Sequence, residues 1–249
     1  MKTYKLKSKI YKTYKSRYIK ISKNQLRVFD SLLNDGSTSK KYLDKYGKLR
    51  YSEHSGLLDF SLASLQRILV NSIPNISDKD DHEILLPENM PDAFDYEYMF
   101  HTHPLTPKIG SRIKDGILYE FPSVQDIFQF IEHHNIGKIQ GSIIIAPEGL
   151  YLIKAINPNK KIKIKNENSA FNYISDKIYE IQDIAIEKYG YKFSKKKFYN
   201  KISQNKKFIK MYSDAIKKYG IKIHYKPRIK NKSGDWILNN LYLKVKPVE

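Results

Sequence analysis

The sequence predicts an α/β protein of the α+β kind, with strands and helices mixed along the chain and a Lys-rich, mainly helical C-terminal extension. Apolar residues recur at helical spacing in residues 24–34 and 124–131, which predicts an amphipathic helix in each segment. Residues 141–153 form two apolar runs around a Pro-Glu-Gly turn, the pattern of a β-hairpin. Beyond residue 165, long Lys-rich stretches carry a single apolar face, as surface helices do.

The elements of the first third follow from local periodicity and from turn residues. In chain order, we predict a strand within residues 1–22, a helix over 24–34, a strand over 49–60, a helix over 61–73 and a strand over 83–86. The segment 61–73 (SLASLQRILVNSI) is predicted to be helical because its apolar residues recur three and four positions apart.

The middle of the chain contains the clearest strand and helix boundaries. An aromatic-rich strand leads into His101-Thr102-His103 and is ended by Pro104. Ser123 lies where the N-cap of the next helix belongs, directly before an apolar-periodic segment. The hairpin of residues 141–153 follows that helix.

The C-terminal third is predicted to contain two helices and a strand pair. The helices end at the Lys-Tyr-Gly triplets 188–190 and 218–220, because glycine tolerates the positive φ that often follows a helix. The same triplet closes a short helical piece at 45–47. The tail, residues 221–245, is predicted to form two strands across a turn at 231–235.

The composition restricts the chemistry of any active site. The 249 residues include no cysteine, which excludes disulfides, Cys-type zinc fingers, iron–sulfur clusters and a cysteine nucleophile. A metal ion must therefore be held by carboxylates and by some of the seven histidines. No apolar run approaches the roughly 18 residues of a membrane helix, and no apolar block of a signal peptide follows the basic N-terminus. We therefore expect a cytoplasmic protein in a reducing compartment.

The formal net charge of +19 is unevenly distributed along the chain. Residues 1–50 carry +12 (15 basic and 3 acidic groups), residues 51–150 carry −9 (6 and 15) and residues 151–249 carry +16 (24 and 8). An acidic unit between basic flanks indicates a distinct central domain. We expect a basic N-terminal segment (1–22), a central domain (23–160) and a basic helical extension that ends in a strand pair (161–249).

Two histidines and one aspartate have the spacing of a metal site. His101 and His103 are two apart on a strand, so both imidazoles leave the same face, about 6–7 Å apart along the chain. Asp126 lies in the first turn of the following helix, where the helix dipole favours an ionised carboxylate. Two neutral histidines and one carboxylate form a three-ligand zinc site that leaves a position for water.

This pattern resembles the motif of the JAMM (MPN-type) zinc metallopeptidases, H-x-H-P-x7-S-x-x-D with an upstream glutamate. Here the motif is His101-Thr102-His103-Pro104, followed by Ser123-x-x-Asp126. Upstream, Glu53-His54-Ser55-Gly56-Leu57-Leu58 is similar to the E-x-x-G-x-L strand of the family. The hairpin of residues 141–153 resembles the strands that follow the motif helix, and the resemblance covers roughly residues 25–155.

The resemblance implies a mechanism and a fold. His101, His103 and Asp126 are implied to bind Zn²⁺, Glu53 to take a proton from the metal-activated water, and Ser123 to steady the oxyanion. The implied fold is a curved mixed β-sheet flanked by helices. The implied reaction is hydrolysis of a peptide or isopeptide bond in a polypeptide or ubiquitin-like conjugate. The AT-biased composition is similar to versions of the family in large DNA viruses, which would place the protein in host cytoplasm or virion.

The sequence departs from the family pattern at two places. Residues 105–122 separate Pro104 from Ser123, 18 residues where the pattern has 7, so the metal-site loop contains an insertion. Loop closure entropy grows slowly with length, so an insertion of this size is tolerated. The helix predicted over 61–73 stands where the family continues with strands, and Glu97 is therefore the alternative proton acceptor.

Other functions remain open from the sequence. His133 and the adjacent His134 are about two helical turns from Asp126, which is too far for them to bind the same metal ion. Lys and Tyr alternate in residues 2–20 and 192–212, which suits non-specific, salt-sensitive binding of nucleic acid as well as a solvated surface. The alternative function is a catalytically inactive MPN-like scaffold in a basic structural or nucleic-acid-associated protein. A non-haem iron oxygenase fits less well, because its ligands usually occur in the reverse order.

Overall fold

The computed structural model describes residues 17–38, 41–43, 49–51, 53–61, 64–70, 96–103, 109–137 and 139–246. At its centre is a six-stranded mixed sheet with the order β5-β4-β6-β7-β8-β9. The strands are β4 (Ser55–Phe60), β5 (Leu65–Val70), β6 (Tyr98–Thr102), β7 (Gly141–Ile145), β8 (Gly149–Ala155) and β9 (Ile221–Pro227). Strands β6 and β7 are parallel and the other neighbours are antiparallel. The predicted class, a mixed sheet flanked by helices, is confirmed.

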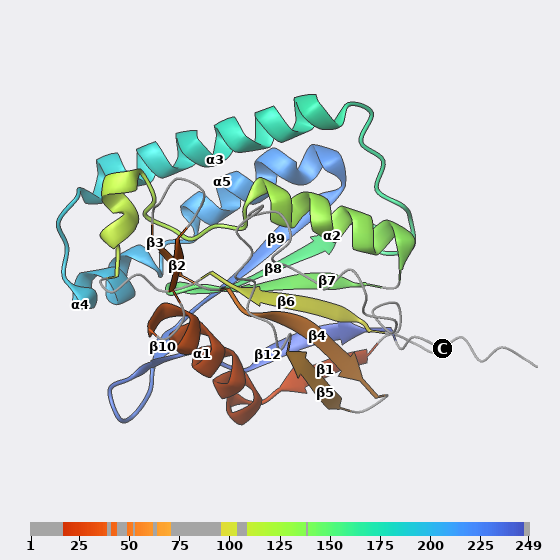
Figure 1. The fold of residues 1–249 in the computed structure, drawn as a ribbon, viewed down its shortest axis with the longest axis horizontal. Coiled ribbons are helices and arrows are strands. Elements are labelled where there is room, and N and C mark those ends of the chain that lie inside the picture. The colour runs from red at the N-terminus through yellow and green to blue at the C-terminus, as the bar shows by residue number, and fades with distance from the viewer. Residues whose placement is uncertain are drawn as a thin grey trace, which may run out of the picture.

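Both faces of the sheet are covered (Figure 1). Helices α2 (Val124–Ile136), α3 (Glu167–Tyr189) and α5 (Lys207–Ile216) lie on one face and share one apolar core. On the other face lie α1 (Lys23–Thr38) and the antiparallel pair of β1 (Arg17–Ile21) and β12 (Leu241–Val245), which share a second core. Alternate residues of each central strand therefore point into different cores, as the pleat requires.

Short elements connect these layers. They are β2 (Lys41–Leu43), β3 (Leu49–Tyr51), a 3₁₀ helix (Ser111–Asp115), α4 (Lys195–Lys197), a π-helical turn (Phe198–Ile202), a 3₁₀ turn (Lys217–Tyr219), β10 (Ile229–Lys230) and β11 (Trp236–Ile237). Within the described helices, none is long and apolar enough to cross a membrane.

The helix predicted over residues 61–73 is wrong. Residues Leu65–Val70 form β5, which pairs with β4 at the edge of the sheet. The spacing of its apolar residues fits a helix, but the segment includes β-branched Ile68 and Val70, and cross-strand pairing with β4 decides its conformation. The family resemblance predicts strands at this place, so this departure from the family pattern disappears.

Several other predictions are confirmed or refined. The helices predicted from residues 24 and 124 correspond to α1 and α2, and the hairpin of residues 141–153 to β7 and β8. Gly190 (φ 74°) and Gly220 (φ 78°) have the positive φ expected at the two described Lys-Tyr-Gly triplets. The strand predicted over 83–86 and the triplet at 45–47 lie outside the described residues.

The C-terminal segments are divided differently from the prediction. The second Lys-rich helix is interrupted, with α4 and the π-helical turn before residue 203 and α5 after residue 206. In the tail, only β10 and β11 pair with each other across residues 231–235, while β9 pairs with β8 and β12 with β1. Strand β9 completes the central sheet and α5 packs in the same core as α2. The domain boundary expected at residue 160 thus falls within one packed core.

Candidate metal centre

The pairing of β4 with β6 brings Glu53 beside the two histidines. Ser55 of β4 lies opposite His101 of β6. The pairing continues past the strand end, because the His54 amide donates to Thr102 Oγ1 (2.9 Å) and the Thr102 amide donates to the His54 carbonyl (2.8 Å). The same antiparallel register sets Glu53 next to His103.

Gly56, the glycine of the E-x-x-G motif, is required by close packing between strands. A Cβ atom at this position would lie 1.9 Å from the carbonyl oxygen of Leu69 and 2.7 Å from the ring of Phe100. No side chain fits there without moving backbone of β5. The glycine therefore allows β4 to lie close to β5 and β6, and so supports the position of Glu53.

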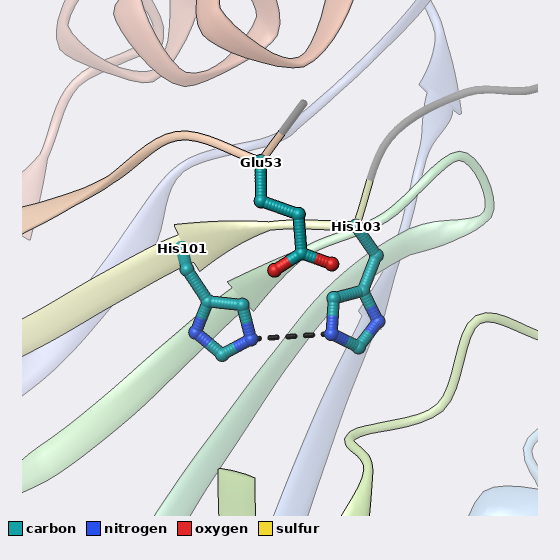
Figure 2. A group of neighbouring side chains, drawn as sticks. All are labelled: Glu53, His101 and His103. Atoms are coloured by element: carbon teal, nitrogen blue, oxygen red, sulfur yellow. Dashed lines mark hydrogen bonds between the residues drawn. The ribbon is translucent and has the colours of Figure 1, made fainter. Parts of the chain in front are cut away.

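The side chains of Glu53, His101 and His103 converge at the end of β6 (Figure 2). One ligand atom from each residue lies within 4.8 Å of the other two, and the Nε2 atoms of the two histidines are 3.1 Å apart. His101 is fully buried, His103 is nearly so, and Glu53 is half-buried. These three residues could hold a metal ion.

Asp126 reaches the same point from the start of α2. Its Oδ1 is 3.1 Å from Nε2 of His101, and its Oδ2 is 3.2 Å from Nε2 of His103. A capping box holds the aspartate, since the Ser123 amide donates to Asp126 Oδ2 (2.6 Å) and the Asp126 amide donates to Ser123 Oγ (3.1 Å). The helix N-terminus therefore both orients this carboxylate and favours its ionised form.

The spacing of His101, His103 and Asp126 is compatible with a metal ion held between them. Ligand atoms about 2.0–2.1 Å from a zinc ion are separated by about 3.3 Å along each edge of the tetrahedron. The Nε2 atoms of the two histidines, 3.1 Å apart, are close to this edge length, and each of them faces a different oxygen of the Asp126 carboxylate, at 3.1 Å for His101 and 3.2 Å for His103. Two imidazole nitrogens and one carboxylate oxygen are also ligand types that zinc accepts.

The predicted insertion supports His103 from outside the metal centre. Nδ1 of His103 lies 3.1 Å from the carbonyl oxygen of Glu120, to which it donates, so Nε2 faces His101 and Asp126. The Glu120 carboxylate in turn accepts from Arg112 Nη1 (2.5 Å). Sequence reasoning missed Glu120, because a backbone carbonyl leaves no residue-type signal. Nδ1 of His101 has no hydrogen-bond partner among the described residues.

The pKa values of three residues in this centre are shifted from their ordinary values. Burial alone would raise the pKa of Asp126, but the charges of and hydrogen bonds from His101 and His103 hold it well below its usual range. Burial would lower the pKa of His103, but the hydrogen bond to Asp126 and the charges of Asp126, Glu53 and Glu120 raise it to about 10. Burial raises the pKa of Glu53, against the opposing effect of the two histidines.

The structure thus brings together Glu53, His101, His103 and Asp126, and places Ser123 beside them as the helix cap. Glu97, the alternative proton acceptor, lies four residues before His101, about 13 Å along the strand. Its Oε2 accepts from the Phe60 amide (3.0 Å). The ring nitrogens of His134 lie 3.0 Å from the Ile139 carbonyl and 3.2 Å from the Lys160 carbonyl, away from the centre.

Sequence comparison relates the chain to a viral protein. An uncharacterized protein of Acanthamoeba polyphaga mimivirus is 36% identical to it over 234 residues. The match spans 91% of this chain and 65% of the viral protein, so the chain covers less than two thirds of that relative's length. No family model matches the chain. No solved structure matches it either.

Proposed function

We propose that this chain is a zinc-dependent hydrolase of peptide or isopeptide bonds, related to the JAMM metallopeptidases. The observation that supports the proposal most directly is the convergence of a glutamate, two histidines and an aspartate from three separate segments of the chain. His101, His103 and Asp126 would hold the ion. A zinc ion in such a site supplies Lewis acidity, which polarises a scissile carbonyl and makes water more acidic.

Glu53 is assigned the role of proton carrier. Its carboxylate lies beside the two histidines without being needed to complete a three-residue ligand set. Burial raises the pKa of Glu53, which suits a group that must both accept a proton from attacking water and release it to the leaving amine. Glu97 is too distant along the strand for this role.

Ser123 is assigned to the developing oxyanion. Its Oγ accepts from the Asp126 amide, so the oxygen is held in place while its own hydrogen stays free of any hydrogen bond within the described residues. A hydroxyl fixed in this way can donate to an oxygen that gains charge during attack on the carbonyl. Helix capping and catalysis are therefore compatible at this residue.

The substrate class follows from the family resemblance. It points to a polypeptide or to a ubiquitin-like conjugate, and the similarity to a mimivirus protein supports a viral setting such as host cytoplasm or virion. The net acidic charge of residues 51–150 gives the catalytic region a character distinct from its basic flanks.

The proposal is tested by combining metal content with activity. Protein purified without added metal should contain about one zinc ion per chain by elemental analysis, and Asp126→Asn should lose it. Glu53→Gln should retain zinc but lower cleavage of linkage-defined ubiquitin dimers or a fluorogenic ubiquitin amide by about 10²–10⁴-fold. Glu132→Gln, an exposed position on α2, serves as the matched control and should change neither quantity.

Two results would contradict the proposal. Wild-type protein purified without zinc would show that the residues do not form a zinc site. A fully active Glu53→Gln variant would show that Glu53 is not the proton carrier. Stoichiometric zinc with no cleavage of any conjugate or polypeptide would instead favour the inactive MPN-like scaffold.

A further inference from the structure

The outer face of the β1–β12 pair combines exposed aromatic rings with lysines. The inward residues of the two strands are aliphatic and belong to the second core, whereas Tyr18, Lys20, Tyr242 and Lys244 point outward. The exposed fraction is 72% for Tyr18 and 52% for Tyr242. Figure 1 places these strands on the opposite side of the central sheet from α2, α3 and α5.

The strand register interleaves the two residue types. Tyr18 lies opposite Lys244, and Lys20 lies opposite Tyr242. Side chains directly opposite on an antiparallel pair are about 4.5–5.5 Å apart at Cβ. Each exposed ring therefore has one lysine opposite it on the partner strand and another two residues along its own strand, and the two rings are diagonal neighbours.

Lysines of the central sheet extend this surface. Lys154 of β8 donates to Tyr98 Oη (2.8 Å), and the Tyr98 hydroxyl donates to the Lys244 carbonyl (2.7 Å), which joins β8 to β12. Lys154 lies opposite Lys222 in the pairing of β8 with β9, and burial together with the charges of Lys222 and Lys244 lowers the pKa of Lys154 to about 8.

Two further lysines lie along the edge strand β9, on either side of His224, whose pKa is lowered by burial and by the neighbouring lysines. Lys222, His224 and Lys226 alternate on one face, so neighbouring members are about 6.6 Å apart along the strand. Within the described part of the chain, no ion pair involves the lysines of this surface, which are Lys20, Lys154, Lys222, Lys226 and Lys244. We call these five lysines, with Tyr18 and Tyr242, the basic aromatic face.

Protection of the sheet edge explains only part of this arrangement. Lysines on an edge strand prevent pairing with another molecule, which would account for Lys222 and Lys226. It does not account for two large, exposed rings on a strand pair set between lysines. Aromatic rings that stack with bases, next to cations that contact the backbone, are the combination used to bind single-stranded nucleic acid.

We propose that the basic aromatic face binds single-stranded nucleic acid without sequence specificity, with bases stacked on Tyr18 and Tyr242 and phosphates held by the lysines. Lysine is a point charge without the planar fork that arginine uses to read bases, so binding follows the phosphate backbone. The proposal does not depend on the metal centre, which lies at the other end of β6 from Tyr98.

The test is fluorescence anisotropy of the full chain with a labelled oligothymidylate at several salt concentrations. We expect binding that weakens steeply between about 50 and 200 mM salt. Tyr18→Ala and Tyr242→Ala should each weaken it about fivefold or more, because each removes a stacked base. The double variant Lys20→Gln and Lys244→Gln should make the slope of log affinity against log salt shallower by about 1.4.

Matched controls come from the other side of the molecule. Tyr179→Ala removes an equally exposed ring (65%) from α3, and Lys161→Gln with Lys163→Gln removes two exposed charges after β8. Neither should change affinity by more than about twofold. Tyr18→Trp should bind at least as tightly as wild type, because indole keeps a stacking surface. Circular dichroism shows whether each variant is folded.

Three outcomes would overturn the inference. They are wild-type protein that does not bind the oligonucleotide, a Tyr179→Ala effect as large as that of Tyr18→Ala, and binding to phosphatidylserine vesicles in place of the oligonucleotide. The last result would identify the face as a membrane contact.

Discussion

At the scale of single residues, the contact between His103 and Asp126 in the candidate metal centre depends on the protonation of His103. His103 has a pKa raised to about 10, and its closest charged partner is Asp126, whose carboxylate stays ionised over the working range. Because the folded pKa is above the ordinary value, this contact stabilises the metal-free protein fully below about pH 6.5. That stabilisation is lost as pH rises through about 10.

The first prediction concerns metal affinity and pH. Zinc must displace the proton of His103, so the apparent association constant should rise about tenfold per pH unit between pH 6 and 8. Competition with a chromogenic chelator measures it. His134→Ala, a histidine outside the centre, should leave this slope unchanged. An affinity independent of pH would contradict the assigned ligand set.

The second prediction separates the two roles of Ser123. Ser123→Ala removes the N-cap acceptor and should lower the free energy of unfolding by about 1 kcal/mol, because the Asp126 amide loses its partner. It should also lower hydrolysis, because the hydroxyl donor is lost. Ser123→Thr keeps the hydroxyl as acceptor and donor and should lose little stability and little activity. Denaturant unfolding and steady-state kinetics of the Ala and Thr variants measure the two effects. If Ser123→Ala is as active as wild type, Ser123 acts only as a helix cap.

At the scale of elements, the turn between β7 and β8 contains a buried carboxyl group. Glu148 is fully buried, accepts from the Tyr151 hydroxyl (2.5 Å) through Oε1, and has no partner for Oε2 among the described residues. Burial and then the charge of Glu120 raise the pKa of Glu148 to about 7. The folded protein thus holds this proton more tightly than the unfolded chain does.

The third prediction is that Glu148→Gln stabilises the protein at alkaline pH. In the wild type, the contribution of Glu148 to stability should fall as pH rises from about 4.5 to about 7, because the folded state must give up a proton it prefers to keep. The Gln variant avoids this loss and should be more stable by roughly 2–4 kcal/mol above pH 7, with little difference below pH 4.5.

Urea unfolding of both proteins at several pH values measures that difference. The amide oxygen can still accept from Tyr151, so the turn keeps its hydrogen bond. A difference between the two proteins that does not vary with pH would show that Glu148 titrates normally.

At the scale of the whole molecule, the candidate metal centre joins parts of the chain that are distant in sequence. Its residues come from the segment before β4, from the end of β6 and from the start of α2. The unfolded chain does not hold these groups together, so under the proposed function zinc bound at this site would stabilise only the folded state.

The fourth prediction follows from this linkage. Free zinc at a hundredfold excess over its dissociation constant should add about 2.7 kcal/mol to the free energy of unfolding. The melting temperature should therefore rise by several degrees, at roughly 2–4 °C per kcal/mol for a chain of this size. A chelator should reverse the shift in scanning calorimetry. The Asp126→Asn variant should show no shift in melting temperature. A wild-type melting temperature that does not change with zinc would contradict the proposed zinc site.

The sequence alone was sufficient for features that depend on neighbouring residues. Strand alternation put His101 and His103 on one face, and the capping signal put Ser123 and Asp126 at the start of α2. The hairpin of β7 and β8 and the two glycine C-caps were equally local. Each of these depends on bond geometry within a few residues, which any chain with this sequence obeys.

Contacts between distant segments could not be predicted in this way. Residues 65–70 have helical spacing and form a strand because β4 offers unpaired backbone beside them. The carbonyl of Glu120 supports His103 only because the insertion folds back onto β6. The basic aromatic face exists because β1 pairs with β12 from the opposite end of the chain.

The sequence by itself therefore predicted the proposed ligands and the local elements that present them. Only the tertiary structure decided which carboxylate stands beside the histidines, since the register of β4 against β6 selects Glu53 over Glu97. The physical reason is that side-chain period and helix capping are properties of adjacent residues, whereas register, burial and the resulting pKa values depend on which distant segments pack together.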